Sequence, residues 1–156
     1  MVAVGGAVML GSCCVIPPHP GRYFDRWQSP EQTLKGFVYA IETGYWDYAY
    51  ECLTAETRNE IGRFKFEAVI RWASDPAFHE VPIYEVIKAS ILVRSRPVIE
   101  GRQAWIKVAP TVTSSDGVRI VFPAKLYFSF DAGSEEWLFD FLGTLQGVPG
   151  AKPLPE

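Results

Sequence analysis

The chain has few of the residues that enzyme and metal sites most often use. Its 156 residues include three cysteines and two histidines, His19 and His79, and no CxxC pair, which excludes the common zinc-binding patterns. The sequence also lacks GxSxG, SxxK, HExxH, Walker and GxGxxG motifs. We therefore expect no metal and no cofactor. His79 is expected to be a surface residue.

Basic residues are also not in excess. Fifteen Lys and Arg stand against 18 Asp and Glu, which gives a net charge of -3. Proteins that bind nucleic acid need cations to neutralise phosphates, so the composition excludes this class of partner. By contrast, 14% of the residues are aromatic and 48% are hydrophobic. This supplies enough apolar area for one folded domain, and it argues against a disordered chain.

An uncharged apolar run at the N-terminus is too short to span a bilayer, which takes about 20 residues in a helix. Residues 1–12 have no charged side chain and end in Gly11-Ser12 before Cys13. The run resembles the signal of bacterial lipoproteins, although the usual Lys or Arg before it is missing. The resemblance implies a signal segment over 1–12 and lipidation of Cys13, with the protein anchored in the membrane of a bacterial cell envelope. The alternative is a buried first strand or a frayed tail.

Residues 13–28 are expected to form a tether. The segment Pro17-Pro18-His19-Pro20 disfavours both helix and central strand and favours an extended chain. Cys52 lies in a helical stretch and is expected to be buried and unpaired. A Cys14–Cys52 disulfide in an oxidising envelope is the alternative.

Helical patterns occupy the first half of the folded part. The segment Ser29-Pro30-Glu31-Gln32 predicts a helix start with Ser29 as N-cap, and Gly44 predicts its end, so the first helix is expected over 30–43. Apolar residues three or four apart predict further helices over 45–53, 54–61 and 64–73.

From Ile83 onwards the apolar period changes to two. Strands are predicted over 83–93, 103–113, 118–130 and 136–142, with turn-forming residues between them. Short connections predict an antiparallel meander. The predicted fold class is therefore α+β, with N-terminal helices packed on a curved sheet of four or more strands.

This order of elements resembles the nuclear transport factor two-like superfamily over residues 29–143. Three segments carry the resemblance, namely Ser29-Pro30-Glu31-Gln32, Thr43-Gly44-Tyr45-Trp46-Asp47-Tyr48-Ala49 and Glu136-Trp137-Leu138-Phe139-Asp140. The resemblance implies a cone-shaped domain with a cavity, which relatives use for catalysis or for holding a ligand or partner. Residues 144–156, rich in Pro and Gly near the end, are expected to be a flexible tail.

The candidate site residues follow from that cavity. An isomerase-like site needs a carboxylate base and an acid such as tyrosine. Glu85, within an apolar alternation, and Asp140 are the candidate carboxylates, and Tyr127 is the candidate acid. Tyr84 and Trp105 are candidate ligand-binding residues. The simpler alternative is that Glu85 is solvated, Asp140 is structural and the aromatic residues pack.

We interpret the chain as a cell-envelope lipoprotein whose cone domain binds a small apolar ligand or an envelope protein. One alternative is an isomerase or dehydratase-like enzyme that uses a pocket carboxylate, and another is a structural homodimer formed through the outer sheet face. Arg94, Arg96 and Arg102 form either a solvated turn or a docking point for an anionic headgroup. A cavity containing a buried carboxylate would favour catalysis, an apolar cavity would favour ligand binding, and a filled core would favour a scaffold.

Overall fold

The computed structural model describes residues 16–79, 81–92, 95–114, 116–147 and 154. The helices are α1 (Pro30–Thr43), α2 (Trp46–Glu51), α3 (Ala55–Ile61), α4 (Arg63–Ser74), α5 (Ile83–Ser90) and α6 (Phe141–Gln146), with a short 3-10 helix η1 (Pro20–Arg22). The strands are β1 (Val98–Glu100), β2 (Gln103–Val108), β3 (Thr111–Thr113), β4 (Arg119–Val121), β5 (Ala124–Asp131) and β6 (Glu136–Asp140).

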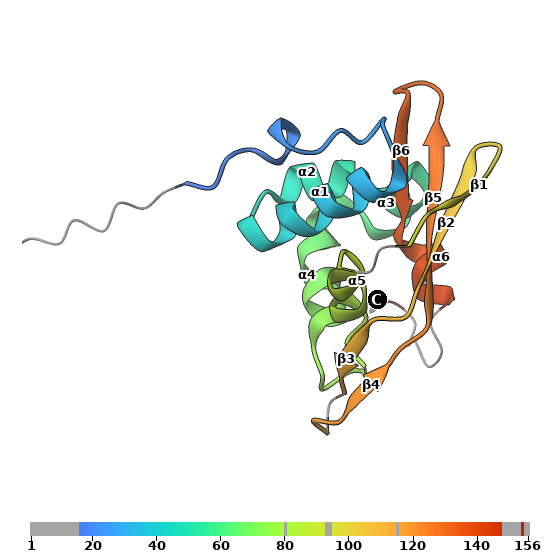
Figure 1. Ribbon diagram of the computed structural model, residues 1–156. Helices are drawn as coiled ribbons and strands as arrows, with labels where there is room; N and C mark the ends of the chain where they lie inside the picture. The colour runs from blue at the N-terminus through green and yellow to red at the C-terminus, as the bar shows by residue number, and fades with distance from the viewer. Residues whose placement is uncertain (1–15, 80, 93–94, 115, 148–153, 155–156) are drawn as a thin grey trace, which may run out of the picture.

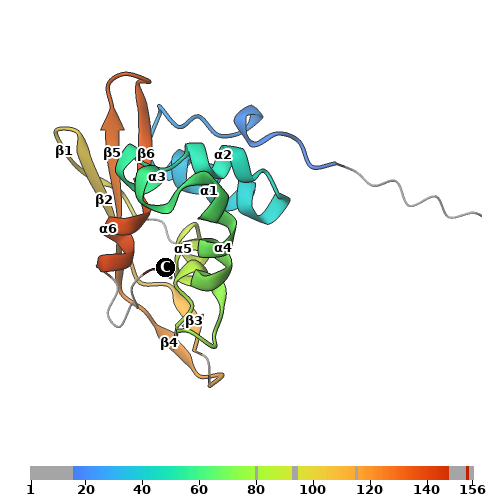
Figure 2. The same ribbon diagram turned by 180° about the vertical axis from the view of Figure 1, so that it is seen from behind.

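The elements form two layers. Helices α1, α2, α4 and α5 lie together on one side of an antiparallel sheet with strand order β1-β2-β5-β6 (Figures 1 and 2). Strands β3 and β4 form a separate two-stranded ribbon below the sheet. The predicted α+β class, with helices before strands, is confirmed.

Helix α1 begins and ends at the predicted residues. The Ser29 hydroxyl accepts a hydrogen bond from the Gln32 backbone N–H at 3.3 Å, and Pro30 occupies the first helical position. At the other end, Gly44 takes a left-handed conformation with φ of 80°, which glycine adopts without strain. The predicted helix from Thr54 to Ile61 is also confirmed, because the Thr54 hydroxyl caps α3.

The predicted strand over 83–93 is wrong, because this segment contains helix α5. Its buried residues include Ile83, Val86, Ile87 and Ser90, a spacing of three and four that forms one helical face. The run is so apolar that it fits a period of two equally well, and sequence alone therefore did not separate the two structures. Helix α5 packs against α4 and β3.

Two long predicted strands are each interrupted by a proline. The segment 103–113 divides into β2 and β3 at Pro110, and 118–130 divides into β4 and β5 at Pro123. Proline has no N–H to donate to a ladder. The sheet still has four strands because β1, in a segment expected to be a turn, takes the place of the wrongly predicted strand.

The free edge of β6 is covered by two other segments. The Phe139 N–H donates to the Cys52 carbonyl at 2.7 Å, and the Thr54 N–H donates to the Phe139 carbonyl at 3.1 Å. Further along the same edge, the Trp137 N–H donates to the Arg26 carbonyl at 2.9 Å. Two segments therefore form hydrogen bonds with backbone groups that β6 would otherwise leave unpaired. One is the link between α2 and α3, and the other is the N-terminal segment.

Aromatic side chains fill the space between the helices and the sheet. The Phe139 ring lies 5.2 Å from both the Phe37 ring of α1 and the Phe128 ring of β5, measured between ring centroids. All three side chains are fully buried. The predicted alternation of β5 is confirmed, since Ala124, Leu126 and Phe128 face the core. Helices and sheet thus share one continuous core.

Both ends of the described chain contact the domain. Residues 144–146, predicted as part of a tail, belong to α6, and Leu154 packs half-buried against the core. Residues 16–28, which we call the strap, run along the helix layer on the side away from α4 and α5 (Figures 1 and 2).

The expected signal segment 1–12 and Cys13 lie outside the described residues. Within those residues, no helix has the length and apolarity to span a bilayer.

Candidate functional site

The predicted carboxylate Glu85 does not lie in a cavity. It is exposed in the first turn of α5, so the solvated alternative is correct. Its neighbour Tyr84 is buried and donates to the Glu42 carboxylate at 3.1 Å, while Lys88 pairs with the other Glu42 oxygen at 3.1 Å. Burial and this carboxylate raise the pKa of Tyr84 well above its usual value. Tyr84 thus joins α5 to α1.

Trp105, Tyr127 and Asp140 form one row across the outer face of the sheet, because Trp105 pairs with Tyr127 and Tyr127 pairs with Asp140. Asp140 is the N-cap of α6, where its carboxylate accepts from the Gly143 N–H at 2.8 Å and faces the Thr57 hydroxyl at 3.5 Å. These contacts match the structural alternative for Asp140. The row lies outside the core rather than inside a cone.

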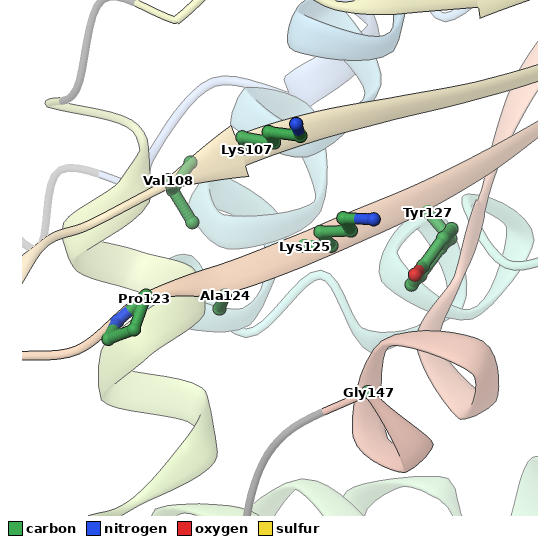
Figure 3. A pocket seen from close by; sticks show the side chains of 7 residues that line it. All are labelled: Lys107, Val108, Pro123, Ala124, Lys125, Tyr127 and Gly147. Carbon is green, nitrogen blue, oxygen red and sulfur yellow. The ribbon is translucent and has the colours of Figure 1, made fainter.

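Tyr127 lines a shallow hollow of about 430 Å³ on this outer face. Lys107 and Lys125, directly opposite each other on β2 and β5, also line it, and Gly147 lies across from them at the end of α6 (Figure 3). Like charges in this position repel each other, and no carboxylate is among the lining residues. The hollow therefore has donors but no base that an isomerase could use.

A second and larger hollow of about 550 Å³ lies where the start of α1 meets the end of α5. We call it the Glu31 recess. Its apolar part comes from Leu34, Ile91 and Ile106, the last on the inner face of β2. Its polar side chains are those of Ser29, Glu31, Gln32, Lys35, Ser90, Ser95 and Arg96. The recess therefore combines one carboxylate, two cations and several neutral polar groups.

The Glu31 carboxylate is the unusual group in this recess. Its Oε2 atom is buried and has no hydrogen-bond partner among the described residues. Lys35 lies one turn further along α1 on the same recess, yet forms no ion pair with Glu31. A buried acceptor without a donor costs about 1–3 kcal/mol, and native proteins keep few of them. Such a group is a candidate for contact with a ligand.

His79 and Cys52, two buried residues with titratable side chains, line neither hollow. His79 is buried with its ring 4.5 Å from the Trp72 ring, so the prediction of a surface histidine is wrong. Its ring completes the packing at the end of α4. Cys52 is fully buried, as predicted, and burial raises the pKa of its thiol to about 12. Cys14, its alternative disulfide partner, lies outside the described residues.

Sequence reasoning missed the Glu31 recess. Glu31 had a clear signal as a first-turn helix residue, but the recess also needs the end of α5, the segment at Ser95 and Arg96, and strand β2. Treating 83–93 as a strand removed α5 from the predicted arrangement. Arg96, considered as a docking cation, does line the recess, whereas Arg102 is exposed in the turn after β1 and Arg94 lies outside the described residues.

The chain was compared with protein-family models, with curated proteins and with solved structures, and none of the three comparisons gave a match. The recess must therefore be interpreted from its own chemistry.

Proposed function

We propose that the protein is a cell-envelope lipoprotein, anchored through Cys13, whose domain binds a small polar ligand in the Glu31 recess. The observation that carries the binding proposal is that Glu31, whose Oε2 is buried and unpartnered among the described residues, lines a hollow of about 550 Å³. The size falls within the range of about 300–1,000 Å³ that is usual for ligand sites. The anchor is supported by Gly11-Ser12-Cys13 after an apolar run.

The lining groups indicate which ligand chemistry fits. An unpaired carboxylate oxygen needs a hydrogen-bond donor, and a protonated amine is the strongest one available. Lys35 and Arg96 supply donors that can hold an anionic or carbonyl group of the same ligand. A small amine that also carries an acceptor, such as an amino acid or a short peptide end, therefore fits the recess better than a purely apolar compound.

The same lining distinguishes ligand binding from catalysis. The enzyme alternative needs a tyrosine or a neutral acid opposite the carboxylate, and the residues that line the recess include neither. An apolar ligand would need space inside the core, where the phenylalanines of α1, β5 and β6 already pack against each other. These observations favour binding of a polar ligand at the edge of the core.

Removing the Glu31 carboxylate should stabilise the protein. Glu31→Leu is expected to raise the free energy of unfolding by about 1 kcal/mol. It removes an unsatisfied buried acceptor that costs about 1–3 kcal/mol and loses a first-turn negative charge worth about 0.3–1 kcal/mol. Urea denaturation of both proteins measures the difference. A stabilising substitution of this kind is typical of a site retained for function.

Glu56→Leu is the matched control. Glu56 occupies the same position in α3, two residues after its N-cap, but it is exposed. This change loses only the interaction with the helix N-terminus and is expected to lower the free energy of unfolding by about 0.3–1 kcal/mol. Equal effects of the two substitutions would show that burial of Glu31 carries no cost.

Binding is tested on the unlipidated Cys13→Ser chain by titration with small primary amines, followed by the amide signals in NMR spectra. We expect shifts confined to residues 29–35, 90–92, 95–96 and 106. Adding Glu31→Leu should abolish them, and adding Glu56→Leu should leave them intact. The proposal fails if no amine shifts these signals, or if the response survives Glu31→Leu.

A further inference from the structure

The strap, residues 16–28, is fastened to the helices along most of its length. The hydroxyls of Tyr39, Tyr45 and Tyr48 donate to the carbonyls of Pro18, Pro17 and Phe24, respectively. Burial raises the pKa of Tyr48 to about 12, so this phenol keeps its proton and remains a donor. The strap is therefore a fixed part of the surface and does not separate the domain from the anchor as the predicted extended tether would.

Further contacts hold both ends of the strap. The His19 ring meets the rings of Tyr45 and Tyr48 edge-on, at centroid distances of 5.3 and 5.4 Å. At the other end, the Arg26 guanidinium pairs with Glu136 at 3.1 Å and lies 5.0 Å from the centre of the Tyr48 ring. These contacts join the strap to α2 and β6 and fix its position on the surface of the domain.

The strap also leaves three large side chains exposed to solvent. Ile16 is 80% exposed, and Tyr23 and Trp27 are each 60% exposed. Tyrosine and tryptophan are the residues that gather at the interface between a bilayer and water, because their rings are apolar and their edges polar. One isoleucine and two aromatic side chains exposed within twelve residues are more apolar surface than a solvated segment needs.

The position of the predicted anchor shows what these side chains would meet. Cys13 precedes Ile16 by three residues, and a chain of that length spans at most about 11 Å when fully extended. A lipid on Cys13 therefore holds the start of the strap against the bilayer, while the contacts at Pro17 and Pro18 prevent the domain from moving away.

We propose that Ile16, Tyr23 and Trp27 lie in the interfacial zone of the bilayer that holds the anchor, so that the domain rests on the membrane along its strap. This inference depends on the proposed lipidation of Cys13. In this orientation the membrane contact is made by the strap side of α1 and α2, and α4 and α5 lie farther from the bilayer (Figures 1 and 2).

Quenching of tryptophan fluorescence by brominated lipids tests the orientation. The full chain, extracted from membranes and returned to phosphatidylcholine vesicles, is compared in lipids with bromine near the headgroup and in unbrominated lipids. We expect the wild-type protein to be quenched, and Trp27→Phe to remove at least half of the quenched intensity. Trp105→Phe, which alters the outer sheet face, should leave the bromine effect unchanged. Trp27 is exposed, so its replacement should not disturb folding.

The possible failures are distinguishable. A chain whose intact mass shows no lipid, and which does not remain with the vesicles, refutes the anchor and the orientation together. A lipidated, vesicle-bound chain that shows no quenching, or equal quenching with and without Trp27, refutes only the orientation. Quenching lost in Trp105→Phe instead would place the outer sheet face on the membrane and overturn the proposal.

Discussion

Cys13→Ser is expected to move the protein from the membrane fraction to the soluble fraction almost completely. Each buried methylene of an acyl chain contributes about 0.8 kcal/mol to membrane binding, so a lipid with two or more chains outweighs any contact of the strap itself. Within the described residues no helix could replace the anchor by spanning the bilayer. Fractionation of cells followed by a carbonate wash measures the distribution.

Cys14→Ser is the natural control, because the two cysteines are adjacent and only the first follows Gly11-Ser12. It should leave the protein on the membrane. If Cys13→Ser still sediments with membranes after the wash, or if Cys14→Ser releases the protein equally well, lipidation at Cys13 is refuted. If Cys14→Ser releases the protein and Cys13→Ser does not, the lipid is attached to Cys14.

Phe139→Ala is expected to lower the free energy of unfolding by about 3–5 kcal/mol, the usual cost of removing a large aromatic side chain from a core. The Phe139 ring is fully buried between Phe37 and Phe128, so its loss leaves a cavity between helices and sheet. Domains of this kind have a stability of about 5–15 kcal/mol in total. Urea denaturation followed by circular dichroism measures the change.

Phe64→Ala makes the same chemical change at a site without packing, because the Phe64 side chain is 103% exposed. Its effect should stay within about 0.5 kcal/mol. Comparable losses for the two substitutions would contradict the arrangement of the core described above, in which Phe139 joins both layers.

Where sequence prediction succeeded, local chemistry decided the structure. Ser29, Pro30 and Gly44 each have a preferred place at a helix end, and together they predicted α1 to the residue. The alternation in β5 predicted its buried face for the same reason, since a strand places every second side chain on one side. In neither case is a distant part of the chain needed to choose between structures.

The errors arose where tertiary contacts decide. The segment from Ile83 to Ser90 is apolar enough for a strand or a helix, and its packing against α4 and β3 selects the helix. The position of Glu31 in a helix was foreseeable, but its burial depends on α5 and β2, which are distant in sequence. The fixed position of the strap likewise depends on tyrosines from α1 and α2.

The covering of β6 has a consequence for self-association. Because the β6 edge is already paired, β1 is the remaining edge strand of the four-stranded sheet. It is three residues long, and its Val98 and Ile99 side chains are exposed. Two copies that met through β1 would complete each other's hydrogen bonds and leave no second edge of the four-stranded sheet for a third copy. Edge-to-edge pairing through this sheet should therefore stop at pairs and not extend into fibrils.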